Sequence, residues 1–533
     1  NPVIFRATEQ WFVSMDHDGL RQRAIEEIKK VQWSPAWGEE RISNMIATRP
    51  DWCISRQRVW GVPITVFHCE VCEKPLMDAS LARPAIELFQ KEGADAWYTH
   101  PIEDLAAPGA HCPDCGGTKL RKETDILDVW FDSGSSHLAV LGHRWDLPWP
   151  ADAYLEGGDQ YRGWFHSSLL VALVTHRAAP YRQVLTNGWV LDSEGRAMSK
   201  SLGTGVQPEE VIKTHGAEIL RLWAASVDFR EDVVISPEIL TRLSEAYRKL
   251  RNTFRYCLAN LYDFDPQQDI VTAAQLEEID AWAIERTAQV LEQVQAEYEK
   301  FEFHRVYRTL SDFATVDLSA FYFDILKDRL YTAPARSARR RSGQTALYRI
   351  LDALVRAAAP LLSFTTEEAW SHMPAPHLRE PSVHMARALT SSELRASLPE
   401  GLAGKLENWD RLIAARNDVL KALETARQAK VIGSGLEAKV YLDPQGMLKP
   451  VLQEYSTFLP ALFIVSQVEI SSRWPAGVQT IQLPGLKIGI TRASGQKCER
   501  CWNYSEHVGE DQDYPAVCER CSAALAEIEG NGS

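Results

Sequence analysis

Eight of the ten cysteines in this 533-residue sequence fall into four Cys-x2-Cys pairs, and paired thiolates are typical zinc ligands. The two pairs nearest the C-terminus have the spacing Cys-x2-Cys-x16-Cys-x2-Cys, which suits a tetrahedral site built from two tight turns. Four cysteine ligands leave no open coordination position, so the spacing predicts a structural zinc site, with free dithiols or disulfides as the alternative. The predicted ligands are Cys498, Cys501, Cys518 and Cys521.

The other two pairs are separated by 39 residues, so their role is argued from the local sequence as well as from spacing. The string "CPDCGG" has the Pro and Gly of a metal-binding turn, and the insert is long enough to form a hairpin or helix of its own. The neighbouring His68 and His111 are able to replace a thiolate as ligand. The sequence predicts a second zinc site at Cys69, Cys72, Cys112 and Cys115.

A loop with the sequence "GRAMSKSLGTG" follows an apolar run and carries groups suited to phosphate. Lys200 supplies a mobile positive charge, and the hydroxyls of Ser199 and Ser201 can bond phosphate oxygens. The surrounding glycines let the backbone bend and approach a ligand closely. A cation placed in this way stabilises charge that develops on a nucleotide during reaction. A surface turn with one lysine is the alternative.

A glycine turn in "YLEGGDQYRGWFHSSLL" joins a predicted strand to a predicted helix, which is where an open α/β sheet binds ligands. Glu156 is able to hold an ammonium group, while Asp159 and Gln160 can bond ribose hydroxyls or a carbonyl. A helix-capping turn without any ligand explains the same residues.

The secondary structure predicted around these groups differs from one part of the chain to the next. Residues 150–236 alternate strand-like and helix-like patterns, and "QPEEVIKTHGAEILRLWAAS" reads as one helix. Residues 237–375 have an almost continuous helical pattern, typical of a bundle. A proline-bearing linker, a long helix starting near residue 402 and alternating strands follow. This order predicts several domains, as the length also does.

The net charge of −14 would repel a nucleic acid as a whole, so any such contact must come from local basic faces. Arg248, Arg251 and Arg255 lie on one face of a predicted helix and form such a stripe. Arg500 and Trp502, beside the last zinc pairs, suit phosphate contact and base stacking, although solvated surface residues are an alternative in each case. The sequence has no apolar run of the length that a membrane span needs.

The chain resembles bacterial-type isoleucyl-tRNA synthetases, which are class I aminoacyl-tRNA synthetases. The resemblance rests on "DWCISRQRVWGVPI", "DVWFDSGSSH", "EGGDQYRGWFHSSLL", "MSKSLG", "GAEILRLWAAS", "KDRLYT" and "CERCWNY", which occur in that order. It implies a multidomain α/β plus all-α fold: the C-terminal half of a Rossmann-type catalytic domain, a helical-bundle anticodon-binding domain and a small C-terminal zinc-binding domain.

The implied domain boundaries cover the whole chain. They are a connective remnant at 1–60, a zinc-knuckle insertion at 61–145, the second half of the catalytic domain at 146–236, the helical anticodon-binding domain at 237–390, a C-terminal junction α/β domain at 391–484 and a zinc-binding tRNA-contact domain at 485–533.

The resemblance also implies roles for particular residues. Lys200 matches the second lysine of the Lys-Met-Ser-Lys-Ser signature, which contacts the ATP phosphates. Glu156 matches the binder of the aminoacyl-adenylate, with Asp159 and Gln160 in the same pocket. Trp130 and Trp164 are expected to wall that pocket. The implied function is ATP-dependent joining of isoleucine to tRNA-Ile in the cytoplasm, with zinc in the knuckles and Mg²⁺ accompanying ATP.

Two departures from the family pattern shape this expectation. Ala197 stands where the signature has its first lysine, which predicts weakened ATP activation. The family's His-Ile-Gly-His signature, the first half of its nucleotide fold and its editing domain are expected to precede residue 1. The chain is therefore expected to be a C-terminal portion that is inactive alone. The alternatives are a non-catalytic tRNA-binding module, or one half of a split synthetase whose N-terminal half is a separate polypeptide.

Overall fold

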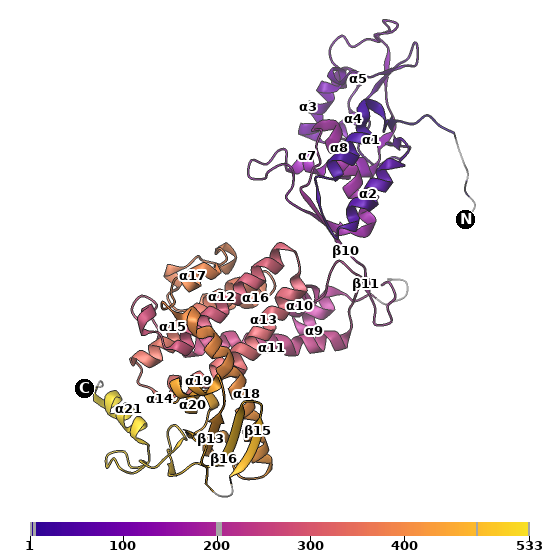
Figure 1. The fold of residues 1–533 in the computed structure, drawn as a ribbon. Helices are drawn as coiled ribbons and strands as arrows, with labels where there is room; N and C mark the ends of the chain where they lie inside the picture. The colour runs from indigo at the N-terminus through magenta and orange to yellow at the C-terminus, as the bar shows by residue number, and fades with distance from the viewer. Residues whose placement is uncertain (1–2, 4–6, 199–204, 476–477, 531–533) are drawn as a thin grey trace. The chain divides into compact units, whose positions relative to one another are not determined.

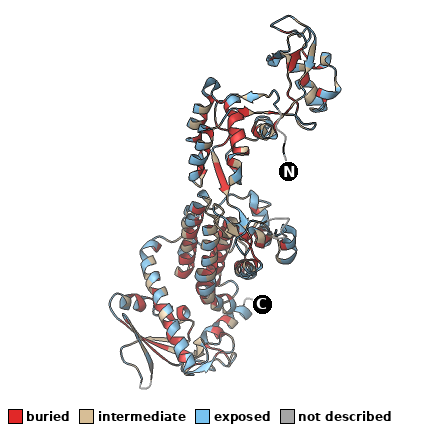
Figure 2. Cartoon of the chain, turned by 90° about the vertical axis from the view of Figure 1, so that its right-hand side faces the viewer, coloured by how far each residue is buried: buried red, intermediate tan, exposed pale blue. Residues whose placement is uncertain are grey.

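The computed structural model describes residues 3, 7–198, 205–475 and 478–530, and the chain divides into two compact units (Figure 1). The first unit comprises Asn1–Leu191 with Phe229–Val233, and the second comprises Asp192–Asp228 with Val234–Ser533. Figure 2 shows that buried residues gather inside the helical and sheet layers of each unit. Among the described residues, no helix combines the length and hydropathy that a membrane crossing requires.

The first unit is built on a three-stranded parallel sheet with the order β2-β10-β9. Its strands are β2 (Gln32–Ser34), β10 (Gln183–Asn187) and β9 (Tyr154–Gly157). The strand β2 comes from the segment 1–60, for which the sequence predicted a connective remnant that leads into the catalytic domain. The sheet therefore draws its strands from both sides of the first cysteine module.

Three helices pack around this sheet: α1 (Leu20–Ile28), α2 (Trp37–Ala47) and α8 (Trp164–Thr175). The helix α8 is buried from Phe165 to Leu173 because apolar residues occur all round it. The core that these elements enclose includes Ile28, Ile42, Phe165, Leu169, Leu173 and Val184.

The first cysteine module is an insert with its own small core. Its strands β5 (Phe67–Cys69), β6 (Pro75–Leu76) and β7 (Leu120–Lys122) form an antiparallel sheet, and Phe67, Trp97 and Leu105 pack beneath α3 (Arg83–Glu92). The short elements of the unit are α4 (Ala96–Thr99), α5 (Ile102–Leu105), α6 (Val129–Gly134), α7 (Ser136–Val140), β1 (Phe12–Val13), β3 (Trp52–Cys53), β4 (Ser55–Arg56), β8 (Ile126–Leu127) and β11 (Val190–Leu191).

The second unit is mainly a helical bundle, drawn in pink and orange in Figure 1. The single helix expected over residues 207–226 is two helices, because Gly216 has φ +91° and ends the first. The bundle helices are α9 (Pro208–His215), α10 (Ala217–Ser226), α11 (Pro237–Asn260), α12 (Glu278–Glu299), α13 (Phe303–Asp312), a π-helix (Phe313–Tyr322), α14 (Phe323–Thr332), α15 (Ala338–Ala358), α16 (Ser363–His372) and α17 (Ser391–Arg395).

An α/β domain and a cysteine module complete the second unit. The sheet has the order β14-β13-β16-β15, and the long helix α18 (Leu406–Gln428) packs against it. The remaining elements are β13 (Ala438–Pro444), β14 (Gln467–Ile470), β15 (Gln479–Leu483), β16 (Leu486–Arg492), α19 (Leu448–Glu454), α20 (Leu459–Phe463), β17 (Gln496–Lys497), β18 (Tyr504–Ser505) and α21 (Glu519–Gly530).

Candidate functional site

The glycine turn lies at the carboxyl edge of the parallel sheet, where the sequence predicted it. Glu156 is near the end of β9, opposite Thr186 of β10, and its side chain is exposed. A single 3-10 turn over Gly158–Tyr161 then leads into α8, and Asp159 in this turn is also exposed. Two carboxylates are therefore accessible at the edge of the sheet where open α/β folds bind ligands.

Gln160 closes the N-terminal end of α8. Its Oε1 accepts a hydrogen bond from the backbone N of Trp164 at 3.0 Å, and its Nε2 donates to Oδ2 of Asp159 at 3.0 Å. The capping interpretation of this turn is thus correct for Gln160, since a helix N-terminus needs such acceptors. The hydrogen bond from Gln160 also holds the carboxylate of Asp159, and the Asp159 side chain is exposed to solvent.

The two tryptophans expected to wall the pocket have different surroundings. Trp130 is half exposed and lies over Gly163, where an added Cβ would come within 2.7 Å of its Cη2 atom. Trp164 stacks on Tyr154 with ring centroids 4.0 Å apart, and its Nε1 donates to the carbonyl of Ser133 at 3.1 Å. The structure therefore brings Trp130 and Gln160 together around Gly163, while the ring of Trp164 holds α6 and α8 together.

A buried carboxylate that the sequence reasoning missed supports Trp130. Asp128 accepts from the backbone N of Trp130 at 3.3 Å and caps α6. It also pairs with Nη2 of Arg56 at 3.0 Å and accepts from Nε1 of Trp52 at 3.3 Å. The signal for it was an Asp directly before the "VWF" run, in the usual N-cap position.

Burial and the nearby Asp128 carboxylate raise the pKa of Asp132 to about 6. Asp132 lies in the first turn of α6, two residues after Trp130. A carboxyl with this pKa exchanges a proton close to neutral pH.

The predicted phosphate loop is described only in part. Ser199, Lys200 and Ser201 lie outside the described residues. Before the loop, Asp192 accepts from the backbone N atoms of Glu194 and Arg196 at 2.9 Å and pairs with the Arg196 guanidinium. These bonds, the backbone N–H of Arg196 first, lower the pKa of Asp192. The turn that leads to Ala197 is thus held by one carboxylate.

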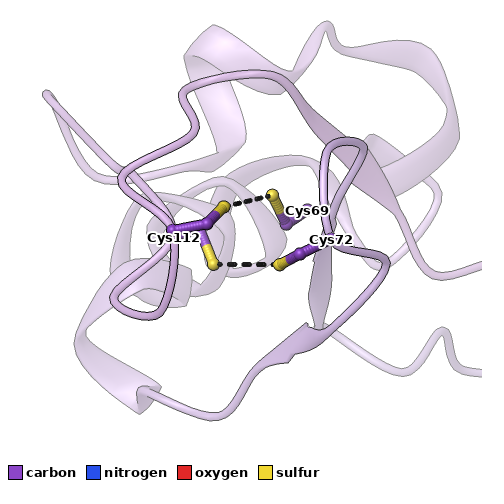
Figure 3. Close-up of side chains that lie close together, drawn as sticks. Cys69, Cys72 and Cys112 are labelled. Carbon is purple, nitrogen blue, oxygen red and sulfur yellow. Dashed lines mark hydrogen bonds between the residues drawn. The ribbon is translucent and has the colours of Figure 1, made fainter.

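Both cysteine quartets converge on a point. In each quartet all four Sγ atoms lie within 4.8 Å of one another. Figure 3 shows Cys69, Cys72 and Cys112 of the first quartet, whose side chains point toward one another. In this quartet the Sγ–Sγ distance is 3.6 Å from Cys69 to Cys115 and 3.5 Å from Cys72 to Cys112. In the second, Cys501 and Cys518 are 3.7 Å apart. Zinc–sulfur bonds of about 2.3 Å in a tetrahedron give S–S separations of about 3.8 Å, whereas a disulfide bond is about 2.05 Å long.

The quartets therefore fit zinc and exclude the disulfide alternative in this structure. Neither histidine beside the first quartet belongs to it: His68 contacts Oε2 of Glu123 at 2.9 Å, and His111 contacts the carbonyl of Gly109.

The last cysteine module is docked on the helical bundle. Nη1 of Arg500 donates to the carbonyl of Thr332 at 2.5 Å, and Arg520 forms a two-bonded pair with Asp328. Arg500 is therefore at least partly a docking residue. Trp502 is 60% exposed, and the ammonium of Lys497 lies 5.4 Å from its ring centroid. The exposed basic and aromatic pair in this module is Lys497 and Trp502.

The arginines predicted to form a stripe on α11 are all exposed. Within the described part of the chain, Arg248, Arg251 and Arg255 make no ion pair, so their charges face solvent. This arrangement is the local positive face that an acidic molecule needs for contact with an anionic polymer.

Comparisons with known proteins match domain families to the parallel-sheet unit, the helical bundle and the last cysteine module. A family model for class I tRNA synthetases (I, L, M and V) matches residues 3–236, and one for the anticodon-binding domain of tRNA ligase matches residues 280–442. A third, for a zinc finger found in FPG and IleRS, matches residues 495–524. The sheet edge, helical bundle and zinc module together define a class I aminoacyl-tRNA synthetase.

Two relatives narrow the family assignment. The chain is 51% identical over 527 residues to an isoleucine–tRNA ligase of Syntrophotalea carbinolica, with 99% of this chain and 56% of the relative covered. It is 50% identical over 537 residues to that of Moorella thermoacetica, with 100% of this chain and 57% of the relative covered. The chain belongs to the isoleucine–tRNA ligase family, and it spans a little over half the length of these relatives.

A solved LeuRS-tRNA-LeuAMS ternary complex from Agrobacterium radiobacter K84 is a weaker match. It shares 21% identity and a TM-score of 0.47, over 65% of this chain and 44% of that one. The assignment therefore depends on the sequence relatives.

Proposed function

We propose that this chain is the C-terminal part of an enzyme that activates isoleucine with ATP and transfers it to tRNA-Ile. The observation that carries the proposal is the identity of about half of all residues with isoleucine–tRNA ligases over the whole chain. The exposed carboxylates at the edge of the parallel sheet and the two zinc-type cysteine quartets support it.

In the first step, a carboxylate oxygen of isoleucine attacks the α-phosphorus of ATP, and the bond to the leaving pyrophosphate breaks. Such a reaction depends mainly on positioning and on neutralising developing charge. Lys200, with Ser199 and Ser201, steadies the pyrophosphate, and Mg²⁺ accompanies the ATP. Glu156 and Asp159 hold the isoleucyl-adenylate, with Trp130 and the Gln160 cap forming one wall, and Trp164 supports this wall from behind.

In the second step, a terminal ribose hydroxyl of the tRNA attacks the acyl carbonyl and AMP leaves. The tRNA is bound by Arg248, Arg251 and Arg255 on α11 and by Trp502 with Lys497 on the zinc module, while Arg500 positions that module. Zinc in both quartets has a structural role, since four thiolates fill its coordination sphere.

The rest of the nucleotide fold is supplied, on this proposal, by the signature-bearing segment of the family. Two observations on the first unit support this view. Within the described residues β9 pairs only with β10, so its other edge is open to a further strand. Val59 and Trp60 are almost fully exposed, which is unusual for neighbouring apolar residues. On the same proposal, the complete enzyme acts in the cytoplasm.

A second candidate function is a tRNA-binding module without catalysis. It is favoured by Ala197, which removes one positive charge from the phosphate loop. The two candidates differ in whether the loop still supports ATP chemistry.

Isoleucine-dependent ATP–pyrophosphate exchange distinguishes the candidates. It is measured with this chain alone and after adding the N-terminal segment of a relative that carries the missing signature. We expect exchange on mixing, its loss in Lys200→Ala, and an increase of up to about 100-fold in Ala197→Lys. If no mixture exchanges pyrophosphate although tRNA-Ile still binds, the catalytic proposal is wrong and the binding module is correct.

A further inference from the structure

Arg41 of α2 is a cation at the carboxyl edge of the parallel sheet, and the proposed reaction gives it no role so far. The strands β2, β10 and β9 are parallel neighbours, so their carboxyl ends meet at one edge. Only Pro35 and Ala36 separate the end of β2 from α2, and Arg41 lies one turn into that helix. The sheet edge that carries Glu156 and Asp159 therefore also carries a positive charge.

Two aromatic rings hold the guanidinium of Arg41. Its central carbon lies 5.6 Å from the ring centroid of Trp37 and 5.4 Å from that of Tyr161. The Tyr161 ring is fixed, because it is buried and its hydroxyl shares a hydrogen bond with Oγ1 of Thr186 at 2.9 Å. The backbone of α2 packs on the same hydroxyl at Gly38, where a Cβ would collide with it. Cation–π contacts with a fixed surface thus restrict the position of the charge.

The guanidinium of Arg41 has no counter-ion in the part of the chain that the structure describes. No carboxylate there pairs with it, and no oxygen there accepts a hydrogen bond from it. The helix positions three and four residues away hold Trp37, Gly38, Asn44 and Met45, and none of these is acidic. Because Arg41 is exposed, its N–H donors are available to an anion that binds at the sheet edge.

The guanidinium also lies beside the glycine turn. A Cβ at Gly158 would be 3.8 Å from Nη1 of Arg41 and 3.8 Å from Cγ2 of Thr186, so the backbone of the turn passes next to this charge. Glu156 lies two residues before Gly158, and Asp159 directly follows it. The turn therefore has two exposed negative groups and one exposed positive group close to its backbone.

An isoleucyl-adenylate carries charges that complement this arrangement. It has one ammonium group on the amino acid and one negative charge on the phosphate that joins the acyl group to the ribose. A planar guanidinium binds phosphate oxygens through two parallel hydrogen bonds, which a single carboxylate-rich turn cannot supply. We infer that Arg41 binds the α-phosphate oxygens of the adenylate, while Glu156 faces its ammonium group. The inference rests on the proposed function, because it takes the adenylate as the ligand.

The test compares a charged and an uncharged ligand, using this chain mixed with the N-terminal segment of a relative. Isoleucinol adenylate keeps the charged phosphate, and the second analogue has an uncharged carbamate in its place. Arg41→Met keeps the apolar stem and should raise Kd for isoleucinol adenylate about 10- to 100-fold, because charge-assisted hydrogen bonds are lost. It should leave Kd for the carbamate unchanged. Arg41→Lys should regain part of the affinity, since it keeps the charge but not the two-pronged geometry.

Arg83→Met, at an exposed arginine of the cysteine insert, is the matched control and should change neither Kd. If Arg41→Met weakens both analogues equally, Arg41 serves packing and the inference is wrong. If it changes neither Kd but slows transfer from preformed adenylate to tRNA-Ile, the bound phosphate belongs to the tRNA and the adenylate assignment is wrong. If the wild-type mixture binds neither analogue, the proposed function fails as well. Circular dichroism checks that each variant is folded.

Discussion

At the residue scale, the candidate adenylate pocket depends on the absence of a side chain at Gly163. A Cβ there would lie 2.5 Å from Oε1 of Gln160 and 2.7 Å from Cη2 of Trp130, both closer than atoms can approach without displacement. The helix cap and the tryptophan wall therefore share one point of contact. A side chain at residue 163 would therefore displace both the Gln160 cap and the Trp130 ring.

Gly163→Ala should accordingly reduce the affinity for a non-hydrolysable isoleucyl-adenylate analogue by about 10-fold or more, because it moves two pocket residues. Overpacking should also lower the free energy of unfolding by about 1–3 kcal/mol. Isothermal titration calorimetry and urea unfolding measure the two effects. Gly404→Ala is the matched control, since nothing lies within 4 Å of a Cβ at that glycine. Equal analogue affinity in both variants would contradict this view of the pocket.

Asp132 provides a pH-dependent prediction. Its pKa is raised by burial to about 6 in the folded protein, above the value of about 3.9 expected when unfolded. The folded state therefore binds more protons between these two values, and the contribution of Asp132 to stability falls as pH rises from about 4 to about 6. Asp132→Asn should then be more stable than wild type at pH 8, by more than at pH 4. Urea unfolding at both pH values measures the difference, and an equal difference at both would refute the assignment.

At the element scale, α8 is the helix that joins the pocket to the core, and it carries an unusual polar residue. His166 is buried, and neither ring nitrogen has a hydrogen-bond partner among the described residues. Burial, with the nearby Arg49 charge, lowers the pKa of His166 to about 3. The folded helix therefore holds a neutral imidazole above pH about 3.

This burial predicts acid sensitivity. The unfolded chain takes up a proton on His166 below pH about 6.5 while the folded chain does not, so stability falls with decreasing pH by about 1.4 kcal/mol per unit. His166→Leu should make unfolding free energy less dependent on pH between 6.5 and 4.5. The exposed His143 supplies the control, because His143→Leu should leave the pH dependence unchanged. If both variants keep the wild-type slope, His166 is not neutral in the folded state.

At the scale of the whole molecule, the two cysteine modules are separate metal-dependent parts, one in each compact unit. Each has a small core of its own, and for so few residues a structural metal supplies stability that apolar burial cannot. Loss of one metal should therefore loosen one module and leave the other intact.

We expect two zinc ions per chain, measured by elemental analysis of protein purified without added metal. Cys112→Ser and Cys518→Ser should each bind one, whereas Cys53→Ser, at a cysteine outside both quartets, should bind two. A strong chelator should lower the thermal midpoint of the wild type. A wild type that holds fewer than two ions after zinc is supplied would show that one quartet is not a site.

The sequence alone determined the features that depend on short spacings. The two Cys-x2-Cys quartets, the helical character of residues 237–375 and the long helix α18 followed by strands were predicted correctly, because turn geometry and the helix and strand periods act within a few residues. The motifs near Glu156 were found for the same reason, and the relatives confirm the family that they indicated.

Only the tertiary structure determined which face of each helix or strand contacts which other element. It placed β2 in the parallel sheet, buried Asp128 beneath Trp130 and stacked Trp164 on Tyr154. It also brought the segment after α16 next to the end of α11. The pairing of β2 with β10 joins residues more than a hundred positions apart, and no local pattern specifies which of several apolar or polar faces will be paired. Close packing makes that choice, because only one arrangement fills the space around each side chain.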